Sequence, residues 1–178
     1  MDRAPKSRQP IDLPFDLEGD EWVSADGNRI LFTNGVASPV RPSHEIYSSE
    51  RVSGVWQTPV RARDVGFPFL TDDENPHLTE DERTLFFESS RADGFGNQDI
   101  WMSTKSGTAW APAINLGSAV NTAEVEGSPF SLDGTELYFD GKGDRGISWT
   151  ARDKAGHWLP ARVIVPRHLR RSIAHPRR

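Results

Sequence analysis

Residues 74–117 read ENPHLTEDERTLFFESSRADGFGNQDIWMSTKSGTAWAPAINLG, and they carry the clearest secondary-structure pattern in the chain. Its apolar residues fall into short runs rich in Phe, Trp, Ile, Leu and Thr, and turn residues such as Asp-Gly-Phe-Gly-Asn and Lys-Ser-Gly-Thr separate them. Runs of this length and composition are typical of β-strands and not of helices. We therefore predict a four-stranded antiparallel meander with strands at residues 76–78, 84–89, 99–103 and 109–116.

The same order of features recurs on both sides of this stretch. Asp26, Asp81 and Asp133 each occupy a turn position, and a pair of large apolar residues follows each of them. The third copy runs as EGSPFSLDGTELYF, GISWTA and HWLPARV from residue 126 to 163, and the first as DEWVSADGNRILF, HEIYSSE and VWQTPV. The Asp residues are 55 and 52 residues apart. A period of this size with four strands per unit predicts the blades of a β-propeller.

A tryptophan closes each unit, with proline two or three residues later, as seen at Trp56, Trp110 and Trp158. Because the position is fixed relative to the unit, we expect these indole rings to pack between blades and not to serve as exposed sugar-stacking platforms. The alternative to a propeller is a β-sandwich that contains three unrelated hairpins.

The units resemble the WD40-like repeats called PD40 that form propellers of the TolB type. The matching positions in the second unit are Pro76, Asp81, Leu85-Phe86-Phe87, Gly94-Phe95-Gly96, Asp99-Ile100-Trp101, Trp110 and Asn115-Leu116-Gly117. The third unit lacks the Asp before its Ile147, and the first has Glu21 where Pro is usual. The resemblance covers about residues 11 to 163 and implies an all-β propeller, a protein-binding role and a periplasmic or extracellular location.

We predict three regions in the 178-residue chain. Residues 1–10 form a disordered amino terminus, residues 11–164 hold blades at approximately 14–65, 66–118 and 119–164, and residues 165–178 form a basic, disordered tail. Ile11-Asp12-Leu13 is either the last strand of a preceding blade or a chance apolar triplet. Complete propellers have about four to eight blades. Three blades therefore indicate a fragment, an incomplete arc, or half of a homodimer that completes the ring.

Composition narrows the possible partners and locations. A net charge of −5 disfavours non-specific binding to nucleic acid, and the absence of cysteine excludes disulfides and thiolate metal sites. No apolar run reaches the ~20 residues that a membrane-spanning helix needs. The amino terminus has no apolar core of a signal peptide, which leaves a cytoplasmic location open beside the one that the resemblance implies.

The candidate binding residues precede or lie in the first strand of a unit. If that strand is innermost, as the resemblance implies, their side chains approach the rim of a central channel. Paired carboxylates there could act as general acid and base on a glycoside, or they could cap turns and bond backbone amides between blades. The candidates are Asp73, Glu74, His77, Glu124 and Glu126, with Asp72 beside them.

Other chemistry has weaker support in the sequence. No histidine pair has metal-ligand spacing, and we expect His77 to be a hydrogen-bonded strand residue, with a ligand or base role as the alternative. Asp93, Asn97 and Asp99 superficially resemble a calcium loop, but we expect Asp99 to bond turn amides beside its own strand. Ser128 is not in a nucleophile elbow, and the Gly-rich runs open no helix. We predict no cofactor and no metal.

The sequence therefore predicts a non-enzymatic binding or scaffold module that contacts a protein or an envelope component. A carbohydrate-active propeller, either glycosidase or sugar-binding, is the alternative from a different class. A truncated propeller without independent activity is the third possibility.

Overall fold

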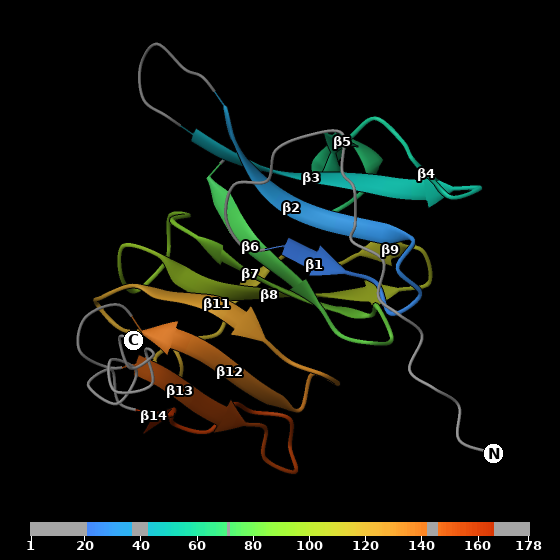
Figure 1. Ribbon diagram of the computed structural model, residues 1–178. Helices are drawn as coiled ribbons and strands as arrows, with labels where there is room; N and C mark the ends of the chain where they lie inside the picture. The colour runs from blue at the N-terminus through green and yellow to red at the C-terminus, as the bar shows by residue number, and fades with distance from the viewer. Residues whose placement is uncertain (1–20, 37–42, 71, 142–145, 166–178) are drawn as a thin grey trace, which may run out of the picture.

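The computed structural model describes residues 21–36, 43–70, 72–141 and 146–165. Over these ranges the protein is all-β, with three antiparallel sheets side by side and one short 3-10 helix, η1 (Ala62–Val65). Figure 1 shows the sheets following one another as a propeller segment of about three blades. The predictions for residues 1–10, for Ile11-Asp12-Leu13 and for residues 166–178 lie outside the described residues.

The first blade contains five strands. Strands β1 (Glu21–Val23), β2 (Arg29–Val36), β3 (Ser43–Val52) and β4 (Val55–Trp56) are adjacent in that order, and β5 (Val60–Arg61) also pairs with β3. Ser53 and Gly54 form the two-residue turn between β3 and β4, and both have positive φ. That conformation is the one that a tight hairpin turn requires.

The second blade corresponds to residues 74–117, the stretch in which four strands were predicted. Its order is β10 (Ile114–Asn115), β8 (Asp99–Ser106), β7 (Thr84–Ser89) and β6 (Asp73–Leu78), with β9 (Ala109–Trp110) also on β8. The prediction of one continuous strand at residues 109–116 is wrong, because this range contains two short strands, β9 and β10, which pair with β8 separately. Pro112 lies between them and has no N–H with which to continue the ladder.

The third blade has four strands, β11 (Glu126–Phe130), β12 (Glu136–Gly141), β13 (Gly146–Ala151) and β14 (Arg162–Val165), adjacent in sequence order. The last strand begins later than the run HWLPARV suggests, since Trp158 makes only an isolated bridge with Arg152. It ends at Val165, the residue at which the basic tail was predicted to begin.

The turn between the first and second strand is the same in all three blades. The Oδ1 atom of Asp26, Asp81 and Asp133 accepts the backbone N–H two residues later, at 3.0, 3.0 and 2.9 Å. This Asx turn explains why Asp recurs at that position. A hydroxyl two residues before each Asp accepts a second backbone N–H at 2.9 to 3.1 Å and comes from Ser24, Thr79 and Ser131.

Two apolar clusters fill the spaces between the blades. The first joins Leu31 and Trp22 of the first blade to Leu85, Phe87 and other residues of the second. The second joins Phe86 and Ile100 of the second blade to Leu137 and Phe139 of the third. Each large side chain that is fully removed from water here contributes about 1.5–3 kcal/mol, so these clusters hold the arc together.

Two of the three repeated tryptophans pack between blades as expected. Trp110 stacks on Phe67, in the segment that leads into the second blade, with ring centroids 5.7 Å apart. Trp158 of the third blade meets Phe86 of the second edge-on, with ring centroids 6.0 Å apart. Trp56 is half-buried and lies outside both clusters.

A hydrogen bond also links the first strand of the second blade, and the first strand of the third blade, to the preceding blade. The backbone N–H of Asn75 in β6 donates to Thr33 Oγ1 of β2 at 3.0 Å. At the equivalent place the N–H of Ser128 in β11 donates to Glu88 Oε1 of β7 at 2.5 Å. Both donors have positive φ and lie where the strand register shifts, so a bulge in each inner strand turns a backbone donor toward its neighbour.

Candidate functional site

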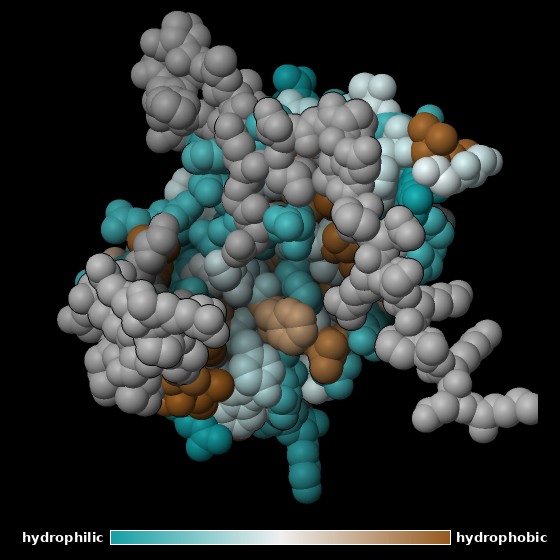
Figure 2. Space-filling view, in the orientation of Figure 1, coloured by the Kyte–Doolittle hydropathy of each residue, from teal (hydrophilic) through white to brown (hydrophobic). Residues whose placement is uncertain are grey.

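The first strands of the three blades lie next to one another and line a groove. One part of the groove, with a volume of about 350 Å³, lies between Trp22 of β1, His77 and Leu78 of β6, and Phe130 and Leu132 at the end of β11. A second part of about 320 Å³ continues past Asn75, Pro76, Ser128 and Pro129. In Figure 2 apolar residues reach the surface among hydrophilic ones on the face where these strands lie.

His77 lies at the centre of the groove and belongs to both of its parts. Its Nε2 is 2.8 Å from the carbonyl oxygen of Ser131 in the third blade. A carbonyl oxygen can only accept, so Nε2 carries the proton and the neutral ring keeps an acceptor lone pair on Nδ1. The prediction of a hydrogen-bonded strand histidine is confirmed. Burial lowers the pKa of His77, although the bond to Ser131 acts in the opposite direction.

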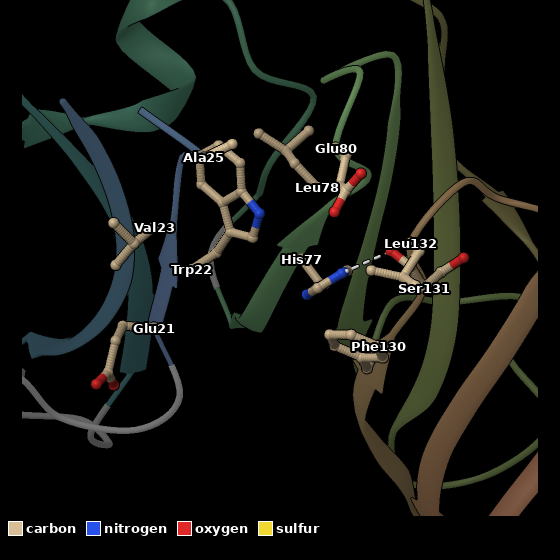
Figure 3. A pocket seen from close by; sticks show the side chains of 10 residues that line it. All are labelled: Glu21, Trp22, Val23, Ala25, His77, Leu78, Glu80, Phe130, Ser131 and Leu132. Carbon is tan, nitrogen blue, oxygen red and sulfur yellow. Dashed lines mark hydrogen bonds between the residues drawn. The ribbon is translucent and has the colours of Figure 1, made fainter. Parts of the chain in front are cut away.

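The bulges in β6 and β11 place the central ring pair of the groove. His77 is opposite Phe86 in the register of its hairpin, and Phe130 is opposite Tyr138 in the next blade. The imidazole and Phe130 rings lie 4.8 Å apart at a tilt of 52°. The second and third blades thus place equivalent positions side by side in the groove, one as a polar ring and one as an apolar ring (Figure 3).

Two carboxylates that the sequence analysis did not select line the same groove. Figure 3 shows Glu21 on β1 to one side of His77 and Glu80, just after β6, to the other. Both residues are exposed. Glu80 directly precedes the repeated Asp81, and Glu21 occupies the position at which the repeat usually has proline. The acidic residue in place of that proline was the sequence feature that could have indicated Glu21.

The other apolar residues of the groove were also missed. Phe130 is 46% exposed and Leu132 is 57% exposed, although their hydrophobicity favours burial. In sequence they flank the buried Ser131, an alternation that is equally typical of an ordinary strand end. Only the pocket that these residues share with β1 and β6 shows that they form a wall of the groove.

Asp73 does not line the groove and instead forms a buried ion pair. Its carboxylate is fully buried, accepts two hydrogen bonds from the guanidinium of Arg91 and accepts a third from the N–H of Leu70 at 2.6 Å. Burial raises the pKa of Asp73, and the bonds from Arg91 act against that effect. This carboxylate fixes the entry into β6 and has no free face for a ligand.

Glu74 bridges blades. Its Oε1 lies 3.2 Å from His44 Nδ1 of the first blade and accepts a bond of 3.0 Å from Gln98 Nε2 of the second. Asp72, beside it, makes a reciprocal pair with His44, in which each residue's backbone N–H bonds the other residue. These contacts agree with the alternative that such carboxylates bond turns and backbone amides between blades.

Glu126 and Glu124 complete the predicted set. The Glu126 carboxylate is fully buried and accepts the N–H of Thr122 at 2.8 Å and its hydroxyl at 2.6 Å, beside a separate hollow of about 170 Å³. Glu124 is exposed, and its backbone carbonyl accepts the N–H of Asn97. Of the predicted residues, His77 therefore lines the groove, while Asp73, Glu74, Glu124 and Glu126 lie elsewhere.

Asp99 behaves as the sequence indicated. Its carboxylate accepts the backbone N–H of Phe95 at 2.5 Å and of Gly96 at 3.1 Å, and the side-chain amide of Asn115 at 2.8 Å. The prediction that it bonds turn amides is confirmed. Within the described ranges no group of three or more histidine and acidic residues is placed to hold a metal ion.

No protein-family model matches this chain, and none of the curated proteins is significantly similar to it in sequence. In the part that the structure describes, no helix has the length and apolar character needed to cross a membrane.

Proposed function

We propose that this chain is a non-enzymatic binding module of the WD40-like, TolB-like propeller type, and that its inner-strand groove contacts a segment of a partner protein. The observation that carries the proposal is the exposure of Phe130 and Leu132 in a concave site. Apolar area removed from water by a partner contributes about 25 cal/mol per Å². A concave, mostly apolar surface with a few polar groups is the usual form of a binding site.

The burial of Asp73 and Glu126 argues against these two residues as the catalytic carboxylates of a glycosidase, whereas Glu21 and Glu80 do line one groove. A glycosidase needs two carboxyl groups that face one cavity and a sugar between them. Asp73 and Glu126 are both fully buried and both engaged by their own neighbours, which supports a structural role for them. A periplasmic or extracellular location, which the family resemblance implies, belongs to the same proposal.

A photo-crosslinking experiment tests the proposal. A benzophenone amino acid replaces Leu132 in the groove or, as a matched control, Leu159, which is 45% exposed on the third blade outside the groove. We expect a discrete crosslinked protein from the native cell with the label at position 132 and not at 159. Equal labelling from both positions, or none from 132, would refute the groove as the contact surface.

A carbohydrate-binding role is decided in parallel. Hydrolysis of a panel of aryl glycosides, or retention on a glycan array that the substitution Phe130→Ala abolishes, would replace the protein-binding proposal with the carbohydrate alternative. Neither is expected.

A further inference from the structure

The charged residues that line the groove are acidic. Among the residues that the structure describes, Glu21, Glu80 and His77 are the titratable ones that line the groove, and neither part has a lysine or arginine in its lining. Both carboxylates are exposed at the rim, so an incoming charge meets them before it loses its water. The whole chain also carries a net charge of −5. A cationic ligand therefore fits this surface and an anionic one does not.

The apolar lining matches the stem of a long cationic side chain. Lysine and arginine carry several methylene groups that cover apolar surface while the charged head stays in water. In Figure 3, Trp22 and His77 lie between Glu21 on one side and Phe130 and Leu132 on the other, and Glu80 lies beside Leu78. A large apolar residue fits against Phe130 and Leu132, and a stem laid over Trp22 and Leu78 brings its charged head to the acidic residues of the groove.

His77 supplies an acceptor between these contacts. Because Nε2 donates to Ser131, the free lone pair of the neutral ring is on Nδ1. Ser128 and Asn75, farther along the groove, add short polar side chains but no charge. An extended peptide can therefore donate a backbone N–H to Nδ1 while its side chains reach the walls.

We infer that the groove binds an extended peptide segment in which lysine or arginine adjoins a large apolar residue, with Glu21 and Glu80 pairing the cations, Phe130 and Leu132 seating the apolar groups and His77 Nδ1 accepting an N–H. This inference rests on the proposed function and specifies its ligand class.

Protonation of His77 opposes such a ligand. The protonated ring has a donor at Nδ1 in place of the acceptor and adds a positive charge beside the incoming cation. The charged groups that line the groove around it are Glu21 from β1 and Glu80 after β6, and the described end of β11 contributes none. Affinity for a cationic peptide is therefore expected to fall as the pH is lowered through the range in which His77 gains its proton.

Fluorescence anisotropy with three labelled, end-capped hexapeptides tests the inference: Arg-Leu, Gln-Leu and Glu-Leu repeated three times. We expect the Arg peptide to bind about 2- to 30-fold more tightly than the Gln peptide at low salt, since two exposed ion pairs are gained, and the Glu peptide not to bind. The variant Glu21→Gln/Glu80→Gln removes most of this preference. Glu124→Gln, an exposed acid outside the groove, is the matched control and retains it.

His77→Gln separates the acceptor role from the fold. The amide can still donate to Ser131 but cannot titrate, so binding of the Arg peptide loses its dependence on pH below about 6.5, the ordinary histidine pKa, which burial lowers in His77. Thermal unfolding of each variant confirms that it is folded at the assay temperature.

Equal binding of the Arg and Gln peptides, or equal effects of the groove variant and Glu124→Gln, would overturn the inference. If that happens while position 132 still crosslinks a partner, the binding role stands and only the cationic ligand class is wrong. If the Arg peptide does not bind and position 132 captures nothing, both proposals fail.

Discussion

Replacing Phe86 with alanine tests whether the contacts between blades hold this protein together. Phe86 is fully buried in the cluster between the second and third blades and meets Trp158 at a centroid distance of 6.0 Å. Truncation of a buried Phe costs about 3–5 kcal/mol, through lost burial and the cavity left behind. Single domains are stable by only about 5–15 kcal/mol, so this loss removes a large part of the total.

Tyr138→Ala is the matched control for this substitution. Tyr138 occupies the equivalent place in the third blade but is only half-buried, because no further blade of the described chain covers it. We expect its truncation to cost about 1 kcal/mol, as is usual for partly exposed sites. Urea unfolding followed by tryptophan fluorescence measures the free energy of unfolding of both variants. The loss of about 3–5 kcal/mol expected for Phe86→Ala corresponds to a fall in Tm of roughly 6–20 °C.

If Phe86→Ala and Tyr138→Ala lower the free energy of unfolding equally, the second and third blades are not coupled through this cluster. A normal loss with a strongly reduced denaturant slope would indicate instead that the third blade has detached while the second remains folded.

Three further predictions follow from the ion pairs, the repeated turns and the shape of the arc. Arg91→Met leaves the buried carboxylate of Asp73 without its cation, and we expect it to lower the free energy of unfolding in urea by about 3–5 kcal/mol. Adding Asp73→Asn should restore most of that loss, and no recovery would contradict the pairing role. In the turns at Asp26, Asp81 and Asp133, a hydrogen bond from a hydroxyl group holds the pKa of the carboxylate below its ordinary value of 3.8. The stability that these carboxylates provide is therefore present above pH 3.8 and is lost as the pH falls below it. Between about pH 5 and 2.5 the unfolding midpoint should drop less in the variant with all three residues changed to Asn than in the wild type, and an equal drop would refute this assignment. Light scattering should give about twice 19.9 kDa if a second copy completes the ring, whereas the mass of one chain would exclude the homodimer at that concentration.

The propeller fold was predictable because local signals and long-range packing agree. The Asx turns at Asp26, Asp81 and Asp133 are written into the sequence, since each carboxylate bonds an amide only two residues away. The strand at residues 84–89 was predicted with its observed bounds, because the consecutive buried residues Leu85, Phe86 and Phe87 make both of its faces apolar. The predicted fourth strand failed where one residue, Pro112, interrupts the ladder.

The groove was much less predictable than the fold. The sequence ranked carboxylates by their position before the inner strand, and that position proved to be where Asp73 and Glu126 turn inward to their own neighbours. The groove depends on which side chains three distant strands present to one another, and that follows from the bulges in β6 and β11. A one-residue shift in register exchanges the faces of a strand, and single-sequence patterns do not locate such shifts.

The central position of the second blade has a consequence for how the protein opens. It packs against a neighbour on each side, and the Asn75 and Ser128 donors tie it to both. In a linear array of coupled units, an end unit can open by breaking one interface, whereas the middle unit must break two. Amide hydrogen exchange should therefore be slowest along β7 and β8 and faster in β12 and β13. The second blade, which carries His77, is then the last to lose its structure, whereas Phe130 on the third blade can move away first.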